Sequence, residues 1–276
     1  MQYEDFLALV KKRRTIRYFK PDPLPKGAIE KILETGRWAM SGGNGQPWEF
    51  LVVTDRAVKA KVGAIINGRQ ERHWALEQTR EQRYRHPGHF RPGLVSDQVR
   101  MINEAPAVII VLGDPRTFQA TVIGNQFFSG EHDIFHMNLG NAAMIMNLAA
   151  ASLGLGAAWQ TIDRPSEHQL KELLGIPLEY KIYVQIPVGY PINVPPPQYR
   201  RTLKEVAHWE KYDKSKYRTH DEIREWLAQC RLGSLPSYDV RKPADSTVEL
   251  IKTAKGGTPA ALTSAKAAPK KPAKKN

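Results

Sequence analysis

The sequence has a single cysteine, Cys230, among its 276 residues, which excludes a disulfide within the chain and indicates a reducing compartment. Long apolar runs are also missing. The longest, residues 105–112, has the length of a strand and falls far short of the roughly 20 apolar residues of a membrane span. The first residues contain neither a basic segment nor an apolar one, so we expect no signal peptide. These absences predict a cytoplasmic protein that does not enter a membrane.

Acidic and aromatic residues are absent from residues 254–276, which hold six lysines among alanines and prolines. Without those lysines the net charge falls from +13 to +7. A segment of this composition buries too little apolar surface to fold alone, so we predict a disordered lysine-rich tail over residues 251–276. The tail either keeps the protein soluble or binds nucleic acid or anionic membrane weakly.

The chain as a whole has an ordinary globular composition, with 41% hydrophobic and 25% charged residues. Hydrophobic periodicity and turn residues predict helices and strands in mixed order. The helices are expected at residues 3–12, 25–39, 56–85, 132–153, 166–174 and 219–230, and the strands at residues 48–54, 108–112, 157–162 and 181–189. A capping-box pair, Thr219 and Glu222, predicts the start of the last helix. Because the elements follow no strict strand–helix–strand rhythm, the sequence predicts an α+β layered domain rather than a doubly wound sheet.

Two of these elements are unusually apolar. The helix at residues 132–153 is apolar nearly all round, which predicts a central helix or a dimer interface. The strand at residues 108–112 is an unbroken run of valine, isoleucine and leucine, which predicts cover on both faces. Gly154 and Gly156 are expected to end the apolar helix before the next strand.

The first candidate site is an arginine segment, residues 13–17, with the sequence Arg13-Arg14-Thr15-Ile16-Arg17. Its three guanidinium groups match phosphate oxygens in bidentate geometry, and its hydroxyl adds a neutral donor. Such a run is also typical of a solvated basic face, so the residues alone leave both interpretations open.

The second candidate site is a glycine-rich turn, residues 41–47, with the sequence Ser-Gly-Gly-Asn-Gly-Gln-Pro. Its glycines allow the backbone to approach a planar ligand closely. The side chains of Ser41, Asn44 and Gln46 could form hydrogen bonds with the edge of a heteroaromatic ring. A plain connection between a helix and a strand is the alternative.

Together with three later motifs, these segments resemble the FMN-dependent nitroreductase-like flavoproteins. The motifs follow the order typical of that family: Arg13-Arg14-Thr15-Ile16-Arg17-Tyr18-Phe19, then Ala39-Met40-Ser41-Gly42-Gly43-Asn44-Gly45-Gln46-Pro47-Trp48, then residues 147–156, Pro187-Val188-Gly189-Tyr190-Pro191 and Tyr199-Arg200-Arg201. The likeness covers about residues 3–205. We therefore expect an FMN-binding domain at residues 1–205, followed by a C-terminal helical extension at residues 206–250.

The resemblance implies an α+β homodimer with a mixed sheet flanked by helices, a long central helix at the dimer interface and FMN bound between the subunits. It also implies the residues that contact FMN. Phosphate and ribityl contacts fall on Arg13, Arg14, Thr15 and either Arg200 or Arg201; Arg17 falls near the pyrimidine edge of the flavin; Ser41 and Gly42 fall where the partner subunit approaches the ring; and Gln160 and Thr161 fall on the N5 side.

The implied activity is the transfer of reducing equivalents from NADH or NADPH to a small planar acceptor such as a nitroaromatic or a quinone. The flavin supplies the chemistry, so no side chain is predicted to be catalytic. His132 and His136 have the spacing of metal ligands, but no third ligand is apparent and no metal is expected. The rival hypothesis is a non-enzymatic protein that binds anions or nucleic acid through its basic segments.

Some features depart from the family pattern. Met40 stands where proline is usual, and Thr15 keeps the hydroxyl of the usual serine. A dehalogenating branch of the family holds its substrate with a Glu-x-x-x-Tyr pair, and none occurs between residues 62 and 93, so we do not predict a deiodinase. Residues 69–91 hold six arginines and three glutamates. They predict either a cationic lid that attracts an anionic ligand or a solvated basic helix and loop.

Overall fold

The structure, a computed structural model, describes residues 2–81, 97–119, 133–197, 200–223 and 225–226. The chain divides into two compact units, Met1–Pro197 and Gln198–Asn276. The first unit holds the sheet and the longer helices, and the second holds short helical segments.

A four-stranded sheet forms the centre of the first unit. Its strands lie in the order β1 (Trp48–Val53), β2 (Ala107–Gly113), β4 (Lys181–Gly189) and β3 (Gly156–Ala157). Neighbouring strands pair antiparallel, and a parallel bridge between Thr15 and Ala157 adds the mixed character at the β3 edge. The strands expected at residues 48–54, 108–112 and 181–189 are confirmed, and so is the α+β class.

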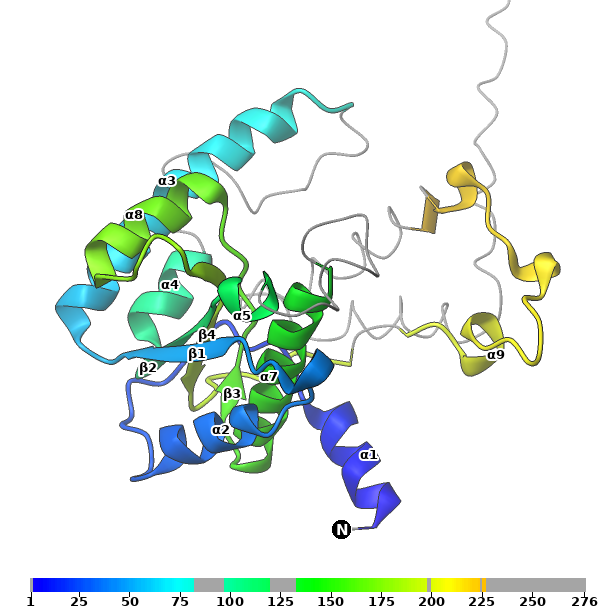
Figure 1. The fold of residues 1–276 in the computed structure, drawn as a ribbon, viewed down its shortest axis with the longest axis horizontal. Helices are drawn as coiled ribbons and strands as arrows, with labels where there is room; N and C mark the ends of the chain where they lie inside the picture. The colour runs from blue at the N-terminus through cyan, green and yellow to red at the C-terminus, as the bar shows by residue number, and fades with distance from the viewer. Residues whose placement is uncertain (1, 82–96, 120–132, 198–199, 224, 227–276) are drawn as a thin grey trace, which may run out of the picture. The chain divides into compact units, whose positions relative to one another are not determined.

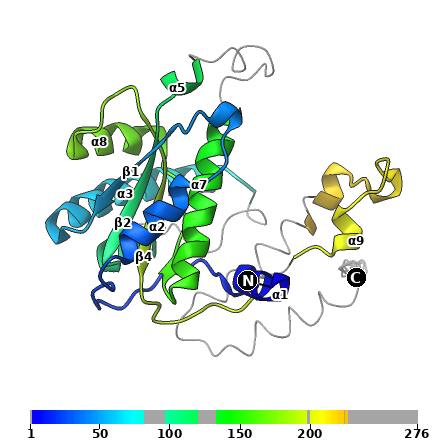
Figure 2. The ribbon, with the colours of Figure 1, turned by 60° about the horizontal axis from the view of Figure 1, so that its bottom comes forward.

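Helices cover both faces of this sheet (Figures 1 and 2). One face carries α2 (Ala28–Arg37) and α7 (Asp133–Ser152), and the other carries α3 (Arg56–Gln78), α4 (Asp97–Glu104) and α8 (Arg164–Leu174). A short helix, α5 (Arg116–Gln119), follows β2. The sheet is therefore the middle layer of three.

β2 contributes to the cores on both of its faces. Ile109 and Val111 pack on the side of α7, whereas Ile110 and Leu112 pack on the side of α3. The whole strand is buried, which confirms the expected cover on both sides. Full burial of each such side chain contributes about 1.5–3 kcal/mol to the free energy of unfolding.

A β-bulge at Tyr183 changes which face the side chains of β4 occupy. Val111 pairs with Val184, but the next residue, Leu112, pairs with Ile182, so Tyr183 is an extra residue. Val184 consequently lies in the α7-side core and Ile182 in the opposite core, although the two are separated by one residue. The bulge directs Tyr183 to the α7 side of the sheet.

Most of the helices begin and end close to the residues predicted from the sequence. The helices expected at residues 3–12, 132–153 and 166–174 are confirmed, the first as α1 (Tyr3–Lys12). α2 begins only at Ala28, because Gly27 adopts a left-handed φ of 76° before it. α3 ends at Gln78 rather than continuing, and residues 82–85 of the predicted helix lie outside the described residues. α4 is not predicted from the sequence, because its 8 residues give too short a periodic pattern.

The end of α7 differs from the prediction in the role of one glycine. Gly154 has a left-handed φ of 74° and ends the helix as expected. Gly156 instead begins β3, where an added Cβ would lie 2.6 Å from the side chain of Ile16. The strand expected at residues 157–162 is reduced to the end of β3 and a separate bridge between Gln160 and Gln185.

The second unit contains α9 (Leu203–Val206) and a 3₁₀ turn, η3 (Lys214–Lys216). The predicted capping box is confirmed: the Thr219 N–H donates to Glu222 Oε2 over 2.7 Å, and the Glu222 N–H donates to Thr219 Oγ1 over 3.3 Å. The predicted tail at residues 251–276 lies outside the described residues. Among the helices that the structure describes, none has the length and apolar character needed to cross a membrane.

Candidate functional site

The arginine segment runs along the β3 edge of the sheet. Thr15 forms the parallel bridge with Ala157, and the Ile16 N–H donates to the Ala157 carbonyl over 3.0 Å. Ile16 is buried and anchors the segment, whereas Arg13, Thr15 and Arg17 are half-buried. The sheet therefore fixes the backbone of the segment while its polar side chains keep access to solvent.

Arg14 folds back on the end of α1. Its Nη1 donates to the carbonyl oxygens of Lys11 and Arg13, the latter over 2.8 Å. These carbonyls belong to the C-terminal end of the helix, where a cation is favourable. Arg14 thus stabilises the C-terminal end of α1 and also adds its charge to the arginine segment.

The glycine-rich turn is tightly wound ahead of β1. It contains a 3₁₀ turn, η1 (Gly42–Asn44), and left-handed φ angles of 59° at Gly43, 54° at Asn44 and 43° at Gln46. Ser41 stabilises the turn, because its Oγ accepts from the Gln46 N–H over 3.1 Å. A left-handed backbone costs about 1–3 kcal/mol at a non-glycine residue and is typical of functional sites.

Two asparagines of α7 hold this turn in place. Asn138 Oδ1 accepts from the Gly42 N–H over 3.1 Å, and Asn141 Nδ2 donates to the Met40 carbonyl over 3.2 Å. The buried Nδ2 of Asn138 has no hydrogen-bond partner within the described part of the chain. Neither asparagine is predicted as a site residue from the sequence, although an asparagine on an otherwise apolar helix is a usable signal of a specific contact.

Gln160 and Thr161 have different environments. The Gln160 backbone N–H and carbonyl are both bonded to Gln185, over 3.0 and 2.9 Å. Both glutamine side chains are buried, and their amide atoms have no hydrogen-bond partner among the described residues. Thr161 is exposed, so it is the member of the pair whose side chain can reach a ligand in solvent.

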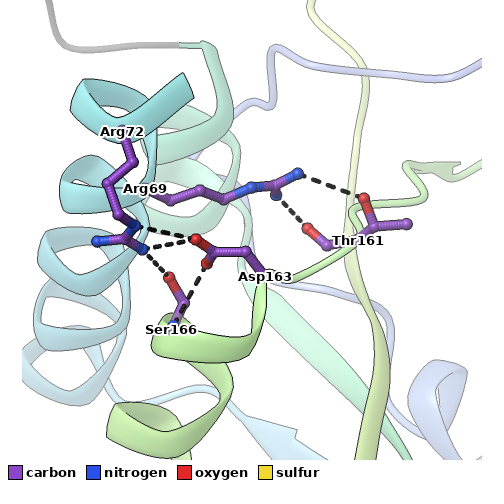
Figure 3. Close-up of polar contacts among 5 residues, drawn as sticks. All are labelled: Arg69, Arg72, Thr161, Asp163 and Ser166. Carbon is purple, nitrogen blue, oxygen red and sulfur yellow. Dashed lines mark hydrogen bonds and ion pairs between the residues drawn. The ribbon is translucent and has the colours of Figure 1, made fainter. Parts of the chain in front are cut away.

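Arg69 and Arg72 tie α3 to the segment that follows the Gln160 bridge (Figure 3). The Arg69 guanidinium donates to the carbonyl of Thr161, and its Nη2 lies 3.4 Å from Thr161 Oγ1. Arg72 donates to Asp163 Oδ2 from Nε over 3.1 Å and from Nη2 over 2.7 Å, and to Ser166 Oγ over 3.0 Å. These two arginines therefore serve internal contacts, which contradicts a free cationic lid at this end of residues 69–91. Residues 82–96, the centre of the predicted lid, lie outside the described residues.

Asp163 begins α8 and neutralises Arg72. Burial opposes ionisation of its carboxyl, but the hydrogen bonds from Ser166 and Arg72 outweigh burial and hold the pKa of Asp163 below its usual range. The Asp163 Oδ1 also accepts from the Ser166 N–H over 3.3 Å, as an N-cap does. Asp163 is therefore ionised at neutral pH and fixes the loop between Thr161 and α8.

An aromatic cluster of Trp159, Tyr183 and His136 lies on the α7 side of the sheet. The ring centroids of Trp159 and Tyr183 are 5.7 Å apart, and those of His136 and Tyr183 are 5.9 Å apart. Burial raises the pKa of Tyr183, so its hydroxyl stays protonated. The other histidine considered as a metal ligand, His132, lies outside the described residues.

Arg200 and Arg201 belong to the second unit. The Arg201 Nη2 donates to the Glu205 carbonyl over 2.6 Å. The Glu205 carboxylate accepts from the N–H and the hydroxyl of Thr202, both over 2.7 Å, and these bonds lower its pKa. Arg201 is therefore partly held by α9, whereas Arg200 is exposed.

The two halves of the predicted FMN site lie at opposite corners of the sheet within one chain. The glycine-rich turn leads into Trp48, which pairs with Gly113, whereas Ala157, beside the arginine segment, pairs with Val188 and through it with Ala107. The two points are three strand spacings apart, about 14 Å, and six residues of β2 apart, about 20 Å. A single chain does not bring Ser41 and Gly42 to the arginine segment.

Each half-site has the chemistry that FMN requires. Three guanidiniums and a hydroxyl on a backbone fixed by the sheet suit a dianionic phosphate. The left-handed turn, with the buried Nδ2 of Asn138 behind it, offers closely spaced polar groups to a ring. The described residues therefore fit the predicted cofactor.

Comparison with known proteins gives a consistent result. The nitroreductase family matches residues 10–190. A protein of Archaeoglobus fulgidus named for NADH dehydrogenase and NAD(P)H nitroreductase activity is 28% identical over 190 residues, which cover 68% of this chain and 86% of that protein. Iodotyrosine deiodinase 1 of Rattus norvegicus is 24% identical over 210 residues, covering 75% and 70%. A solved FMN-dependent nitroreductase from Clostridium difficile R20291 superimposes with a TM-score of 0.53 at 22% identity, covering 75% and 99%.

The structure therefore defines an α+β protein whose two candidate segments, the arginine segment and the glycine-rich turn, lie at different edges of its sheet. The chain belongs to the nitroreductase family, because the family match extends over most of the first unit. The resemblance found in the sequence motifs is thereby confirmed.

Proposed function

We propose that this protein is an FMN-dependent oxidoreductase that transfers reducing equivalents from NADH or NADPH to a small planar acceptor such as a nitroaromatic or a quinone. The arginine segment carries this proposal, because the backbone that bears its guanidiniums and hydroxyl is fixed on the same sheet edge that leads to Thr161. Membership of the nitroreductase family supports it, as does the name of the similar FMN-dependent nitroreductase.

The residues of this chain hold and polarise the cofactor. The phosphate of FMN carries nearly two negative charges, which Arg13 and Arg14 balance, with Thr15 as a further donor and Arg200 or Arg201 as an additional cation. Arg17 stabilises negative charge at the pyrimidine edge. When bound, FMN supplies the hydride and electron chemistry. In the overall reaction NAD(P)H loses a hydride, and a quinone gains two electrons and two protons, one of them from water.

A homodimer completes the site. In one chain the turn with Ser41 and Gly42 lies far from the arginine segment, so a two-fold related copy is needed to supply it. The exposed Met137 and Met144 on α7 provide an apolar surface for that copy. Each of the two FMN molecules would then contact both subunits.

The deiodinase relatives suggest another acceptor class, a halogenated amino acid. The chain lacks the Glu-x-x-x-Tyr pair between residues 62 and 93, so we favour the planar acceptors. The choice is tested by a turnover screen of the flavin-loaded protein with NADH and with NADPH, against nitroaromatics, quinones, enones and 3-iodotyrosine. Turnover of 3-iodotyrosine alone would contradict the proposed acceptor class.

The first prediction concerns Arg13 and Arg201. Arg13→Ala and Arg201→Ala should each weaken FMN binding by about 10- to 150-fold, because a charge-assisted hydrogen bond contributes roughly 1.5–3 kcal/mol. Arg37→Ala is the matched control, since Arg37 is exposed and paired with Glu34 over 2.6 Å. Fluorescence titration of the apoprotein with FMN measures the affinities.

Two outcomes would contradict the proposed function, and a third would contradict the placement of the phosphate site. A wild-type protein that stays colourless after FMN is added has no flavin site. Salt-sensitive DNA binding without NAD(P)H oxidation favours the rival anion- or nucleic-acid-binding function. Unchanged flavin affinity in both arginine variants would move the phosphate site elsewhere.

A further inference from the structure

Arg69 has an unusual position for a charged residue. Its side chain extends from α3 into the protein, and the residue is only 8% exposed. Burial lowers its pKa. Within the described residues, no carboxylate oxygen lies within 4.0 Å of its guanidinium, because Asp163 is engaged by Arg72 instead. A buried guanidinium without a direct ion pair costs stability, so its retention calls for an explanation beyond tethering two elements.

The hydrogen bonds of Arg69 converge on one residue. Both go to Thr161, one to its carbonyl oxygen and one, over 3.4 Å, to its hydroxyl oxygen (Figure 3). The planar guanidinium fork therefore fixes the peptide and the rotamer of Thr161 together, which a lysine ammonium does not do. Tethering of the same loop to α3 is already provided by Arg72 through Asp163 and Ser166.

The contact has a directional consequence for the Thr161 hydroxyl. A hydroxyl that accepts a hydrogen bond from a cation must direct its own proton elsewhere, and it becomes a stronger donor. Thr161 is exposed, and the family resemblance implies a place for it on the N5 side of the flavin. Oxidised flavin N5 is a hydrogen-bond acceptor that matches this donor.

We propose that Arg69 is a positioning residue for the flavin: it holds Thr161 so that the threonine hydroxyl donates to the N5 edge of oxidised FMN. This role rests on the proposed flavin function and adds to it a residue of α3 that does not touch the cofactor. Arg72, one turn further along the same helix, has no such role, because its hydrogen bonds go to Asp163 and Ser166.

The test compares matched variants at both ends of the contact. Thr161→Val removes the hydroxyl, and Thr161→Ser keeps it. Arg69→Lys keeps the charge but loses the fork, and Arg72→Lys is the control on the same helix. Thr161→Val and Arg69→Lys should each weaken the binding of oxidised FMN by about 2- to 10-fold, the effect of one hydrogen bond. Thr161→Ser keeps the hydroxyl, so it should recover most of the affinity that Thr161→Val loses. Arg72→Lys should bind FMN as the wild type does.

Two further readouts separate positioning from general support. The visible absorption band of bound FMN should shift in Thr161→Val and Arg69→Lys in the same direction, and it should not shift in Arg72→Lys. In the double variant, Arg69→Lys should add little to the effect of Thr161→Val, because both remove the same hydrogen bond. Lysine replaces arginine with the charge intact, so these variants test the geometry even where a neutral replacement fails to fold.

The proposal is overturned by an Arg69→Lys protein with wild-type flavin affinity and spectrum, which would assign only charge to this residue. Additive effects of the two substitutions would overturn it as well. A wild-type protein that binds no FMN would remove the proposed function itself. If the wild type binds FMN and Arg69→Lys changes neither the affinity nor the absorption band, only the role of Arg69 is contradicted.

Discussion

At the residue scale, His73 lies in the C-terminal half of α3, close to the guanidinium groups of Arg69 and Arg72. Burial lowers the pKa of His73, and Arg69 and Arg72 lower it further, while Asp163 and Glu77 partly oppose them. The folded protein therefore keeps this imidazole neutral at pH values where the unfolded chain, with a pKa of about 6.5, already binds a proton. In this range only the unfolded state binds a proton at His73. The free energy of unfolding therefore decreases as the pH falls through about 6.5.

The corresponding prediction is that His73→Gln weakens the pH dependence of stability. Between about pH 7.5 and 5.5, the urea midpoint of the wild type should fall more steeply than that of the variant. His168→Gln, at an exposed position on α8, is the control and should follow the wild type. Parallel curves for the wild type and His73→Gln would contradict the assignment.

Residues of the candidate site differ in how far they could be predicted from the sequence. The arginine segment is recognisable because its charged residues are adjacent in the chain and form a motif. The contact between Arg69 and Thr161 spans 92 positions, and an arginine in a basic helix gives no sign of its partner. Such contacts depend on how α3 packs on the sheet, which local patterns do not specify.

At the element scale, the approach of the arginine segment to β3 depends on Gly156. An added Cβ at Gly156 would lie 2.6, 2.8 and 2.9 Å from three atoms of Ile16. Ile16 is β-branched and buried, so it cannot rotate away easily. Glycine at this position therefore lets the backbone of residues 15–17 reach the sheet edge.

We expect Gly156→Ala to lower the free energy of unfolding by about 1–3 kcal/mol, the usual cost of overpacking. FMN affinity should fall as well, because the arginine segment is displaced. Ile16→Ala should relieve the clash, so the double variant should lose less stability than the two single losses combined. The control is Gly68→Ala in α3, where an added Cβ meets its nearest atom at 3.6 Å. A Gly156→Ala protein as stable as the wild type would exclude this explanation.

Elements were predictable where their pattern is local. β2 and β4 are apolar runs of strand length between turn residues, and α7 is a long apolar helix, so composition is sufficient to find them. α4 has too few residues for a clear period, and the bulge at Tyr183 leaves no sequence signal because the run reads equally well without it. The packing of Gly156 against Ile16 likewise appears only in three dimensions.

At the scale of the whole molecule, the proposed FMN site requires a second copy of the chain. The glycine-rich turn, which contains Ser41 and Gly42, lies at one corner of the sheet. The arginine segment lies at the opposite corner. One face of α7 packs on the core. On its outer face, Met137 is 53% exposed and Met144 is 39% exposed. An apolar outer face on a central helix is typical of a surface that pairs with a second copy.

The last prediction follows from this requirement. Met137→Glu and Met144→Glu place a charge on the outer face of α7, and burying an unpaired carboxylate between subunits is costly, so each variant should sediment as a monomer. Because the partner's glycine-rich turn is then missing, each variant should also retain less FMN after gel filtration. Leu178→Glu is the control, at a position 70% exposed between α8 and β4, and it should remain dimeric and flavin-bound. A monomeric Met144→Glu protein that holds FMN with wild-type affinity would show that one chain suffices for the site, and an intact dimer in both variants would place the interface on another surface.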